Sequence, residues 1–547
     1  MSISRSCNGN HKRHKKKIAP CREACPAGID VPRYIRHIRQ RDFDGALAVI
    51  RERIPFPAVC GYACFHPCEA KCARIQYDEA VAIRMLKRAA DEKSRGVLAF
   101  ERKAKSTGKR VAVIGSGPCG LTAAHYLAGL GHAVTVFESL PEAGGMLRYG
   151  IPEYRLPNDV VNREIAAIRR RGVEIVTESP VASAPELLGM GYDAVLVASG
   201  AWKPVRMGIE EEESSLVRDG IAFLKDVNRG AITSVGKKII VVGGGNSAVD
   251  AARACIRIGA KVILLYRRTR EDMPASPEEI AGTEEEGVRI EFLAAPVRIT
   301  KRSAVCIRMT LGPQDDSGRP RPVPVVGSEF SISCNAVIMA VGQRADVGTL
   351  KLAENQNGTA KVDSELATPI RGIFAAGDAV TGPKTIIDAI AQGRLACTSI
   401  DRYLGGEGKI DRDILKNEIE TLPEEKPMGT RRPTPEKLHL KSRLKGFDLV
   451  ESGYNEETAV AEAQRCLACD IRQYTVEVNP VICKECGYCH EMCHMGIFAT
   501  SDSFNASGYK PSIVTSSDHC VGCLKCLYVC PDFAITIQEG RPEQCPA

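Results

Sequence analysis

The sequence predicts a multidomain α/β protein, because one strand–turn–helix–strand pattern occurs twice and cysteine-rich modules stand near both ends. The first copy, at 108–138, is GKRVAVIGSGPCGLTAAHYLAGLGHAVTVFE, and the second, at 236–268, is GKKIIVVGGGNSAVDAARACIRIGAKVILLYRR. Each begins with a β-branched run and ends in a second apolar strand. We expect two Rossmann-like domains, the second inserted in the first, with an N-terminal α-helical cysteine domain and a C-terminal α+β cysteine domain.

The glycine turns of the two copies have the spacing of dinucleotide-binding sites. Their three turn positions are Gly115, Gly117 and Gly120 in the first copy and Gly243, Gly245 and Ala248 in the second. The first glycine allows the tight turn, the second lets backbone approach a pyrophosphate, and the third permits close helix–sheet packing. The helix N-terminus then offers N–H groups to the phosphates. Glycines that serve turns alone are the weaker interpretation, because the whole context occurs twice.

The last residues of the two copies predict different nucleotides. The first ends at Glu138, a carboxylate placed to accept hydrogen bonds from ribose hydroxyls. The second ends with Arg267 and Arg268, and arginines there suit a 2′-phosphate through charge-assisted bonds. We therefore expect FAD in the first domain and NADPH in the second. The alternative for the two arginines is a solvated charge pair.

Composition points to an ordinary globular chain with an unusual cysteine content. Apolar residues make up 44% of the 547, charged residues 26%, and the net charge is +7. We find no run long enough for a membrane span, no signal-peptide pattern and no nucleic-acid motif. The basic run at 11–17 is expected to be a solvated arm, with contact to an acidic partner as the alternative. Twenty-three cysteines at CxxC and CxxxC spacings favour metal or cluster ligands in a reducing compartment, the cytoplasm.

Besides Cys7, the N-terminal hundred residues hold six cysteines around predicted helical segments, namely Cys21, Cys25, Cys60, Cys64, Cys68 and Cys72. The last four follow one another at a spacing of four, which is not a core pattern. Zinc and iron–sulfur clusters both accept such ligands.

Past the second copy the chain is expected to return to the first Rossmann-like domain. GIFAAGDAV at 372–380 reads as a strand ending at Gly377 and Asp378, followed by a helix from near Thr385. Asp378 would then contact the ribityl or phosphate side of a flavin. The expected domains are a helical domain at 1–105, an FAD domain at 106–229 and 336–405, an NADPH domain at 230–335, a linker with a CxxC pair at 406–470, and a ferredoxin domain at 471–547.

The last domain is predicted from two CxxCxxCxxxC runs, the pattern of bacterial ferredoxins with two [4Fe–4S] clusters. The fourth cysteine of each run ligates the other cluster. One site would therefore be Cys483, Cys486, Cys489 and Cys530, and the other Cys520, Cys523, Cys526 and Cys493. His494 departs from the pattern where proline usually follows, whereas Pro531 keeps it.

Residues 20 to about 405 resemble the small subunit of glutamate synthase and the N-terminal part of dihydropyrimidine dehydrogenase. The motifs are CPAGIDVP, PFPAVCGYACFHPCEAKC, GSGPCGL, GGMLRYGIPEYRLP, GGGNSAVD, YRRTREDMPASPEEI and GIFAAGDAV. The resemblance implies two N-terminal [4Fe–4S] clusters and FAD held by Gly115, Gly117, Gly120, Glu138, Gly145, Met146, Arg155, Gly377, Asp378 and Thr385. It also implies NADPH held by Gly245, Asn246, Ser247, Arg267 and Arg268.

The modules together predict an electron-transfer flavoprotein, because a flavin links two-electron hydride transfer to one-electron clusters. The redox-active CxxxxC of disulfide reductases is missing, so Cys119 is expected to be a packing residue. We expect an NADPH:ferredoxin-type oxidoreductase in a hetero-oligomeric complex, with a ferredoxin or a catalytic oxidoreductase subunit as partner. The alternatives are a glutamate synthase small subunit, disfavoured by the extra ferredoxin module, and a multi-cluster scaffold with an unused nucleotide site.

The second N-terminal cluster needs a ligand that the resembled family takes from a Glu or Gln. The matching position here is Lys87, which has no lone pair for iron when charged. An additional cysteine, Cys60, lies one CxxxC step before Cys64, so the expected ligands are Cys25, Cys60, Cys64 and Cys68. The alternative is that Cys60 is a buried free thiol.

The first N-terminal cluster lacks the CxxC pair that precedes CxxxCP in the resembled proteins. A CxxC pair with a similar helical lead-in occurs instead in EAQRCLAC at 462–469. We therefore expect a site of Cys21, Cys72, Cys466 and Cys469, which the intervening chain is long enough to allow. The alternatives are a degraded site and metal binding by Cys466 and Cys469 with another chain.

Overall fold

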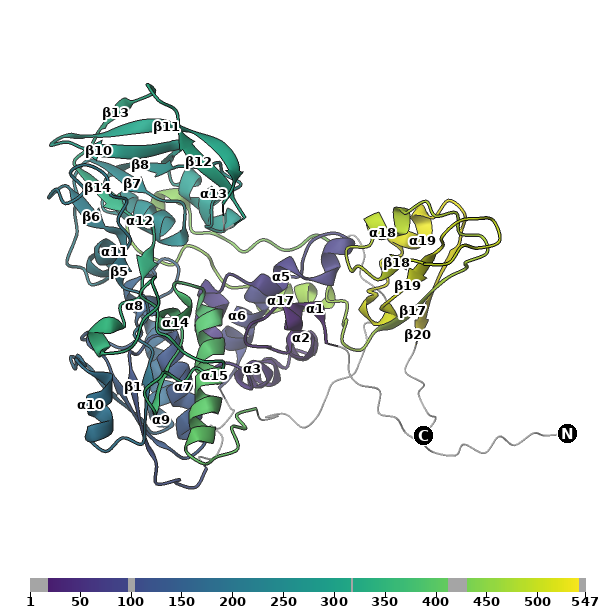
Figure 1. Ribbon diagram of the computed structural model, residues 1–547, viewed down its shortest axis with the longest axis horizontal. Helices are drawn as coiled ribbons and strands as arrows, with labels where there is room; N and C mark the ends of the chain where they lie inside the picture. The colour runs from purple at the N-terminus through teal and green to yellow at the C-terminus, as the bar shows by residue number, and fades with distance from the viewer. Residues whose placement is uncertain (1–17, 97–103, 316–317, 412–429, 541–547) are drawn as a thin grey trace.

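The computed structural model describes residues 18–96, 104–315, 318–411 and 430–540. Two Rossmann-like domains lie one above the other, the helical cysteine domain lies beside them, and the C-terminal cysteine domain lies at the far side of the helices (Figure 1). The basic run at 11–17 falls outside the described residues. Within the described ranges no helix is long and apolar enough to cross a membrane.

The helical cysteine domain is built from short helices whose apolar faces share one core. Aspartates cap two of them, since Asp30 accepts a hydrogen bond from the N–H of Arg33 and Asp42 accepts one from Gly45. The helices are α1 (Pro20–Glu23), α2 (Val31–Arg39), α3 (Phe43–Arg51), α4 (Pro57–Ala63), α5 (Pro67–Ala70), η1 (Ala73–Gln76) and α6 (Ile83–Lys93).

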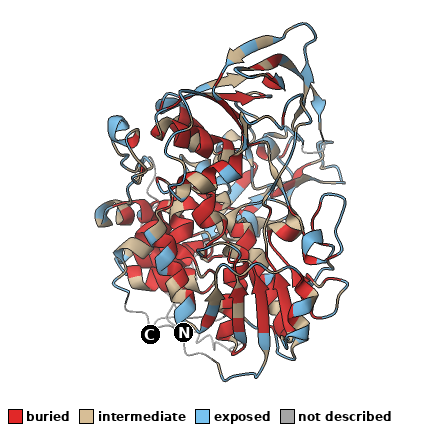
Figure 2. Ribbon diagram, turned by 90° about the vertical axis from the view of Figure 1, so that its left-hand side faces the viewer, coloured by how far each residue is buried: buried red, intermediate tan, exposed pale blue. Residues whose placement is uncertain are grey.

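The first Rossmann-like domain has a five-stranded parallel sheet in the order β16-β4-β1-β2-β3. Strand β4 is buried throughout and β1 is buried except at Arg110, because helices cover both faces of the sheet, whose buried residues are red in Figure 2. The strands are β1 (Arg110–Ile114), β2 (Ala133–Phe137), β3 (Val173–Val176), β4 (Ala194–Val197) and β16 (Ile373–Ala375). The helices are α7 (Pro118–Gly129), α8 (Met146–Tyr149), α9 (Asn158–Arg170), α10 (Ala184–Gly189), α14 (Asp378–Thr381) and α15 (Ile386–Tyr403).

The inserted domain has a second five-stranded parallel sheet, in the order β6-β14-β7-β8-β9. Its strands are β6 (Val217–Asp219), β7 (Lys238–Val242), β8 (Lys261–Tyr266), β9 (Arg289–Phe292) and β14 (Ala336–Met339), and its helices are α11 (Gly220–Asn228), α12 (Asn246–Arg257) and α13 (Pro277–Glu285). The sheet thus runs beyond the 230–335 expected for this domain. The sequence placed β14 in the first domain, but β14 pairs with β7 in the inserted one.

An antiparallel layer covers one side of the inserted sheet. It contains β10 (Ala294–Ile299), β11 (Ser303–Gln314), β12 (Pro320–Pro324) and β13 (Phe330–Ser333). A two-stranded connection, β5 (Lys203–Pro204) with β15 (Gln343–Arg344), joins the two Rossmann-like domains.

The segment from 430 to 470 packs on two other domains rather than running free. Lys437 and Glu451 form a β-bridge, and the turn between them carries α16 (Leu440–Arg443) to the inserted domain, where Phe447 joins its core. Helix α17 (Glu456–Gln464) then packs on α2 and α6 among the N-terminal helices (Figure 1).

The C-terminal cysteine domain is a small α+β unit with two antiparallel strand pairs. These are β17 (Gln473–Val478) with β20 (Ile535–Gly540), and β18 (Phe498–Thr500) with β19 (Ser512–Val514). Short helices α18 (Tyr488–Met492) and α19 (Lys525–Val529) complete it, and five of its cysteines lie in its core, namely Cys483, Cys489, Cys520, Cys526 and Cys530.

Candidate functional site: two nucleotide sites and four cysteine groups

The first glycine of each turn occupies backbone that a side chain would disturb. Gly115 has φ +101°, and a Cβ there would lie 2.5 Å from the carbonyl oxygen of Ala198. Gly243 has φ +139°, and its Cβ would overlap the carbonyl oxygen of Ala340. Both positions therefore require glycine.

The second glycine of each turn has open space in front of it. A Cβ on Gly117 or Gly245 would meet no atom within 4 Å. Next to Gly245, the side-chain oxygen of Asn246 is buried and has no hydrogen-bond partner within the described residues. This open backbone at two helix N-termini fits the pyrophosphates of two dinucleotides.

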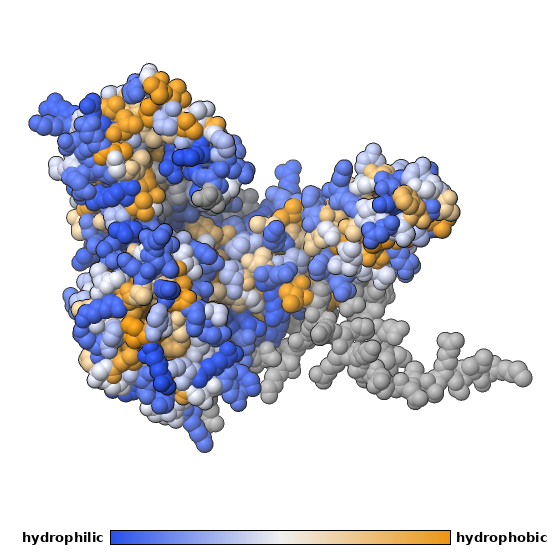
Figure 3. All heavy atoms as spheres, viewed as in Figure 1, coloured by the Kyte–Doolittle hydropathy of each residue, from blue (hydrophilic) through white to orange (hydrophobic). Residues whose placement is uncertain are grey.

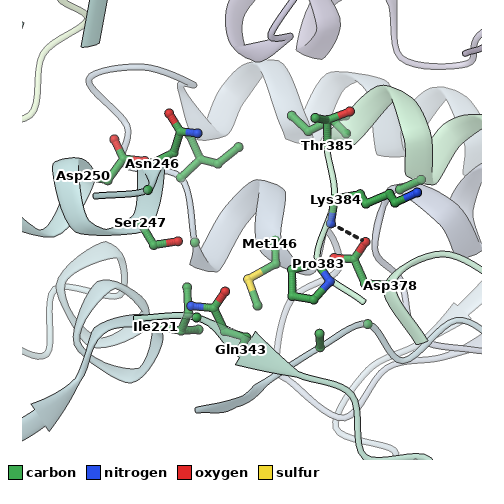
Figure 4. A pocket seen from close by; sticks show the side chains of 18 of the residues that line it. Met146, Ile221, Asn246, Ser247, Asp250, Gln343, Asp378, Pro383, Lys384 and Thr385 are labelled. Atoms are coloured by element: carbon green, nitrogen blue, oxygen red, sulfur yellow. Dashed lines mark hydrogen bonds between the residues drawn. The ribbon is translucent and has the colours of Figure 1, made fainter. Parts of the chain in front are cut away.

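One cavity of about 1750 Å³ connects the two turns. It is lined by all the residues expected to hold nucleotide except Gly120 and Gly377, which pack just behind the first turn. Figure 4 shows Asp378, Lys384 and Thr385 facing it from the first domain and Asn246 and Ser247 from the inserted one. The two turns therefore open onto the same space.

The helical cysteine domain also reaches this cavity. Ala63, Phe65 and His66, from the stretch that carries Cys64 and Cys68, form part of its wall. His66 has the left-handed conformation at φ 41°, which is uncommon for a residue with a side chain. A cysteine-bearing loop thus lies against the place where the two nucleotides would meet.

On the first-domain side, the predicted polar residues are held in place by backbone groups. The carboxylate of Glu138 accepts from the N–H of Ser116 at 3.1 Å and of Leu140 at 2.8 Å. Asp378 accepts from the N–H of Lys384 at 3.2 Å, and burial raises the pKa of Asp378 to about 6. Thr385 begins α15 in a capping box with Asp388.

Three further predicted FAD residues lie at the boundary between the domains. Gly145 packs against Gly117, and Met146, which follows it, contacts the core of the inserted domain. Arg155 lines the cavity, but its guanidinium pairs with Asp250 at 2.7 Å and with Glu279 at 3.2 Å. Two carboxylates of the inserted domain therefore compensate the charge of Arg155. The sequence motif around Arg155 does not predict these ion pairs.

The two arginines expected at the 2′-phosphate are not equivalent. Arg268 is 3% exposed, pairs with Asp315 and donates to the carbonyl of Pro320 at 2.7 Å. Arg267 is exposed and lines the cavity. Arg319 also lines it and was missed, because it comes from the hairpin between β11 and β12, far from the motif in sequence.

Four cysteines of the helical domain gather around α6. Cys25, Cys60, Cys64 and Cys68 are 8%, 0%, 6% and 5% exposed and belong to one core. Burial raises the pKa of Cys60 and Cys68, and interactions with Cys64 and Cys25 add to the rise in both. The structure thus brings the four predicted ligands of this site together, with Lys87 beside them.

A second group brings Cys21 and Cys72 of the N-terminal helices together with Cys466 and Cys469. Burial raises the pKa of the Cys21 thiol, and interactions with Cys469, Cys466 and Cys72 raise it further. The backbone carbonyls next to this pair are also held, since Arg39 donates to Ala463 and Cys466, and Arg74 donates to Arg465 at 3.0 Å. The CxxC segment of 462–469 therefore lies against the N-terminal helices.

The C-terminal cysteines separate into two neighbourhoods. Cys526 interacts with Cys523, Cys493 and Cys520, whereas Cys489 interacts with Cys483 and Cys486. Cys530 lies in the core that cysteines of both neighbourhoods share. Tyr77 of the helical domain donates to the carbonyl of Gly522 at 2.6 Å, and it interacts with the thiols of Cys523, Cys469 and Cys520. Tyr77 thus lies between the Cys21 group and one C-terminal group.

Among the described residues, no three His, Cys, Asp or Glu side chains converge closely enough to hold a single metal ion. A [4Fe–4S] cluster takes one thiolate at each of four irons, whereas a zinc site gathers its sulfurs around one ion.

Cys119 has the packing position expected from sequence. It is 4% exposed, forms no disulfide, and lies where a side chain on Gly377 would meet it at 2.9 Å. A buried lone thiol beside the first turn cannot support flavin–dithiol exchange.

Family models match three parts of the chain. Residues 109–393 match pyridine nucleotide-disulphide oxidoreductases. Residues 12–97 match dihydropyrimidine dehydrogenase domain II with its 4Fe-4S cluster, and residues 482–534 match a 4Fe-4S dicluster domain. These matches agree with the resemblance and the modules predicted from the motifs.

Curated relatives extend over most of the chain. The NADP(+)-dependent formate dehydrogenase subunit beta of Moorella thermoacetica is 41% identical over 82% of this chain and 70% of its own. The NADPH-Fe(3+) oxidoreductase subunit beta of Geobacter sulfurreducens is 38% identical over 84% and 76%. The glutamate synthase [NADPH] small chain of Escherichia coli is 32% identical over 70% and 88%.

The two glycine turns, their shared cavity and the cysteine domains agree with these matches in fold and in chemistry. The predicted multidomain α/β fold and the predicted FAD-dependent NAD(P)H oxidoreductase activity are confirmed. The chain belongs to the pyridine nucleotide-disulphide oxidoreductase family, within which it is an electron-transfer flavoprotein with 4Fe-4S domains.

Proposed function

We propose that this chain exchanges electrons between NADPH and a partner protein through FAD and four [4Fe–4S] clusters. The observation that carries the proposal is the single cavity lined by both glycine turns and by the Ala63–His66 stretch of the helical cysteine domain. Bound FAD would take a hydride from NADPH and release electrons singly, as clusters require. The protein's part is to hold the two nucleotides face to face beside the cluster proposed at Cys25, Cys60, Cys64 and Cys68.

The FAD site is proposed to use the first turn and the residues around it. Glu138 would bind the ribose through a carboxylate already oriented by Ser116 and Leu140. Asp378, at the start of α14, and Thr385, at the start of α15, would lie along the flavin side. Arg155 would contribute mainly by joining the two domains, because Asp250 and Glu279 already take its charge.

The NADPH site is proposed to select its nucleotide through Arg267. Partial burial and the neighbouring Arg268 lower the pKa of Arg267, and a phosphate dianion would relieve that repulsion. Arg268 would act indirectly, by fixing the hairpin through Asp315 and Pro320, and this hairpin places Arg319 at the cavity.

Four clusters are proposed, on the four cysteine groups described above. The set Cys25, Cys60, Cys64 and Cys68 is supported by its common core next to the cavity. The set Cys21, Cys72, Cys466 and Cys469 is supported by the mutual interactions of these thiols. The C-terminal sets are Cys520, Cys523, Cys526 and Cys493, and Cys483, Cys486, Cys489 and Cys530. Their ligands are thiolates, so we expect the chain to work in a reducing compartment such as the cytoplasm.

The cluster at Cys483, Cys486, Cys489 and Cys530 is proposed to face a partner, either a ferredoxin or a catalytic subunit of a hetero-oligomer. Cys486 is exposed there, and so are large apolar side chains, among them Tyr528 and Phe533 at 80% and 82%. Apolar side chains are visible on this end of the molecule in Figure 3. The named relatives are themselves subunits of larger enzymes, which supports the same role here.

The test is a steady-state assay of the purified chain with NADPH and a viologen dye, with the flavin absorbance followed in parallel. We expect NADPH to bleach the flavin and the dye to be reduced. A flavin that NADPH cannot bleach would support the alternative of a scaffold with an unused nucleotide site. Glutamate formation by the chain with a glutaminase partner would instead support the glutamate synthase alternative.

A further inference from the structure

Lys87 on α6 is a buried cation without a conventional partner. The residue is 3% exposed, and within the described residues its ammonium forms no ion pair and no hydrogen bond. An isolated buried ammonium is costly, and such lysines normally lose their charge. Lys87 therefore keeps its charge only where an anionic group lies in the same space.

Helix packing places Lys87 beside the cysteines. Helices α4 and α6 approach so closely that a Cβ on Gly61 would lie 2.8 Å from the Cα of Arg88. Gly61 follows Cys60 in sequence and Arg88 follows Lys87, so this contact places the segment of Lys87 against the segment of Cys60. The thiols that interact with Lys87 are those of Cys64, Cys60, Cys68 and Cys25.

We propose that Lys87 is the fixed counter-charge of the cluster held by Cys25, Cys60, Cys64 and Cys68, and that it raises the reduction potential of this cluster. This inference rests on the proposed ligand set. Lys87 stands at the position where the resembled family has a Glu or Gln ligand, so a cysteine-ligated site would gain a cation where the family has an iron ligand.

The direction of the effect follows from charge balance. One-electron reduction adds one negative charge to the site and no proton. A fixed ammonium in a dry environment stabilises that added charge, and net charge near the thiolates is a main determinant of cluster potential. Lys87 would thus favour electron transfer toward the cluster nearest the cavity, and it is a positioning residue rather than a catalytic one.

The test compares Lys87→Met, which removes the charge at similar length, with Lys87→Arg, which keeps it. Iron content and EPR-monitored redox titration are measured on the full chain. We expect Lys87→Met to keep its iron and to shift one cluster midpoint to lower potential, and Lys87→Arg to stay near wild type. Lys93→Met is the matched control, because Lys93 is exposed at the end of the same helix and should shift no midpoint.

Each remaining outcome decides the matter. Full iron in Lys87→Met with every midpoint unchanged would overturn the proposal, and so would equal loss of the cluster from both variants, which would mean a packing role. Loss from Lys87→Met with retention in Lys87→Arg would support the counter-charge. A failure of the ligand set itself would be seen separately, as wild-type iron that Cys60→Ala does not reduce.

Discussion

The guanidinium of Arg36 pairs with the carboxylate of Asp470 at 2.8 Å, although 434 positions separate them in sequence. Both side chains are nearly buried, at 3% and 9% exposure. Asp470 directly follows Cys469, so this ion pair fixes the CxxC segment on α2, the first of two helices between Cys25 and Cys60. The pair connects the entry of the ferredoxin domain to the N-terminal helices.

Replacing Asp470 with Ala should destabilise this connection. It would leave the Arg36 charge buried and unpaired, which costs roughly 3–5 kcal/mol in comparable buried pairs. We expect the cluster absorbance to be lost at lower urea concentration than in wild type. Glu456→Ala is the matched control, because the Arg41–Glu456 pair joins the same two segments but is exposed. Equal urea sensitivity of the two variants would contradict a special role for Asp470.

Replacing Cys60 with Ala should remove one cluster from the helical domain. Cys60 is fully buried beside Cys64 and Lys87. Lys87 stands at the position where the resembled family has a Glu or Gln ligand. We expect iron analysis to show a loss of about four irons per chain, one [4Fe–4S] cluster. Cys255→Ala serves as control, since Cys255 is a buried thiol in the core of the inserted domain. Unchanged iron and EPR signals in Cys60→Ala would mean that Cys60 is a packing residue.

Replacing Arg267 with Ala should reduce the preference for NADPH over NADH. A lost charged hydrogen bond to the 2′-phosphate is worth roughly 1–3 kcal/mol in the ratio of kcat/KM values. We expect NADPH efficiency to fall and NADH efficiency to change little. Arg268→Ala should instead lower thermal stability, because Arg268 holds Asp315 and Pro320. Equal efficiency with both nucleotides in the wild type would refute the assignment.

The contact between α9 and α4 should weaken as pH rises. Glu164 accepts from the N–H groups of Ala58 and Val59, both at 2.9 Å, and burial raises the pKa of Glu164 from 4.5 to about 8. The folded state therefore binds more protons than the unfolded state between these values, and stability falls by up to about 1.4 kcal/mol per pH unit up to pH 8. Thermal unfolding between pH 6 and 9 should show a smaller decline for Glu164→Gln. Identical slopes would show that Glu164 stays ionised.

Local motifs were enough to predict much of this fold and site. The turns at Gly115 and Gly243 and the two CxxCxxCxxxC runs have chemistry that depends on neighbours in sequence, so their spacing reveals them. The cofactor classes follow from the same motifs, and the family matches agree.

Partnerships between distant segments could not be predicted in the same way. Tertiary packing pairs Arg268 with Asp315 and Arg155 with Asp250. It also places Arg319 at the cavity. The segment at 406–470 is predicted from sequence to be a linker, because its apolar residues are few and separated, although Phe447 packs against the core of the inserted domain. Such contacts leave no periodic signal in sequence.

The central claim is that Cys466 and Cys469 complete a cluster with Cys21 and Cys72 in the same chain. The most direct measurement is the iron content of the full chain, reconstituted anaerobically, with Cys466 and Cys469 both changed to Ala. Four [4Fe–4S] clusters require about sixteen irons per chain in the wild type, and the account predicts about twelve in the double variant. Retention of the wild-type iron content and EPR spectrum by the double variant would contradict it.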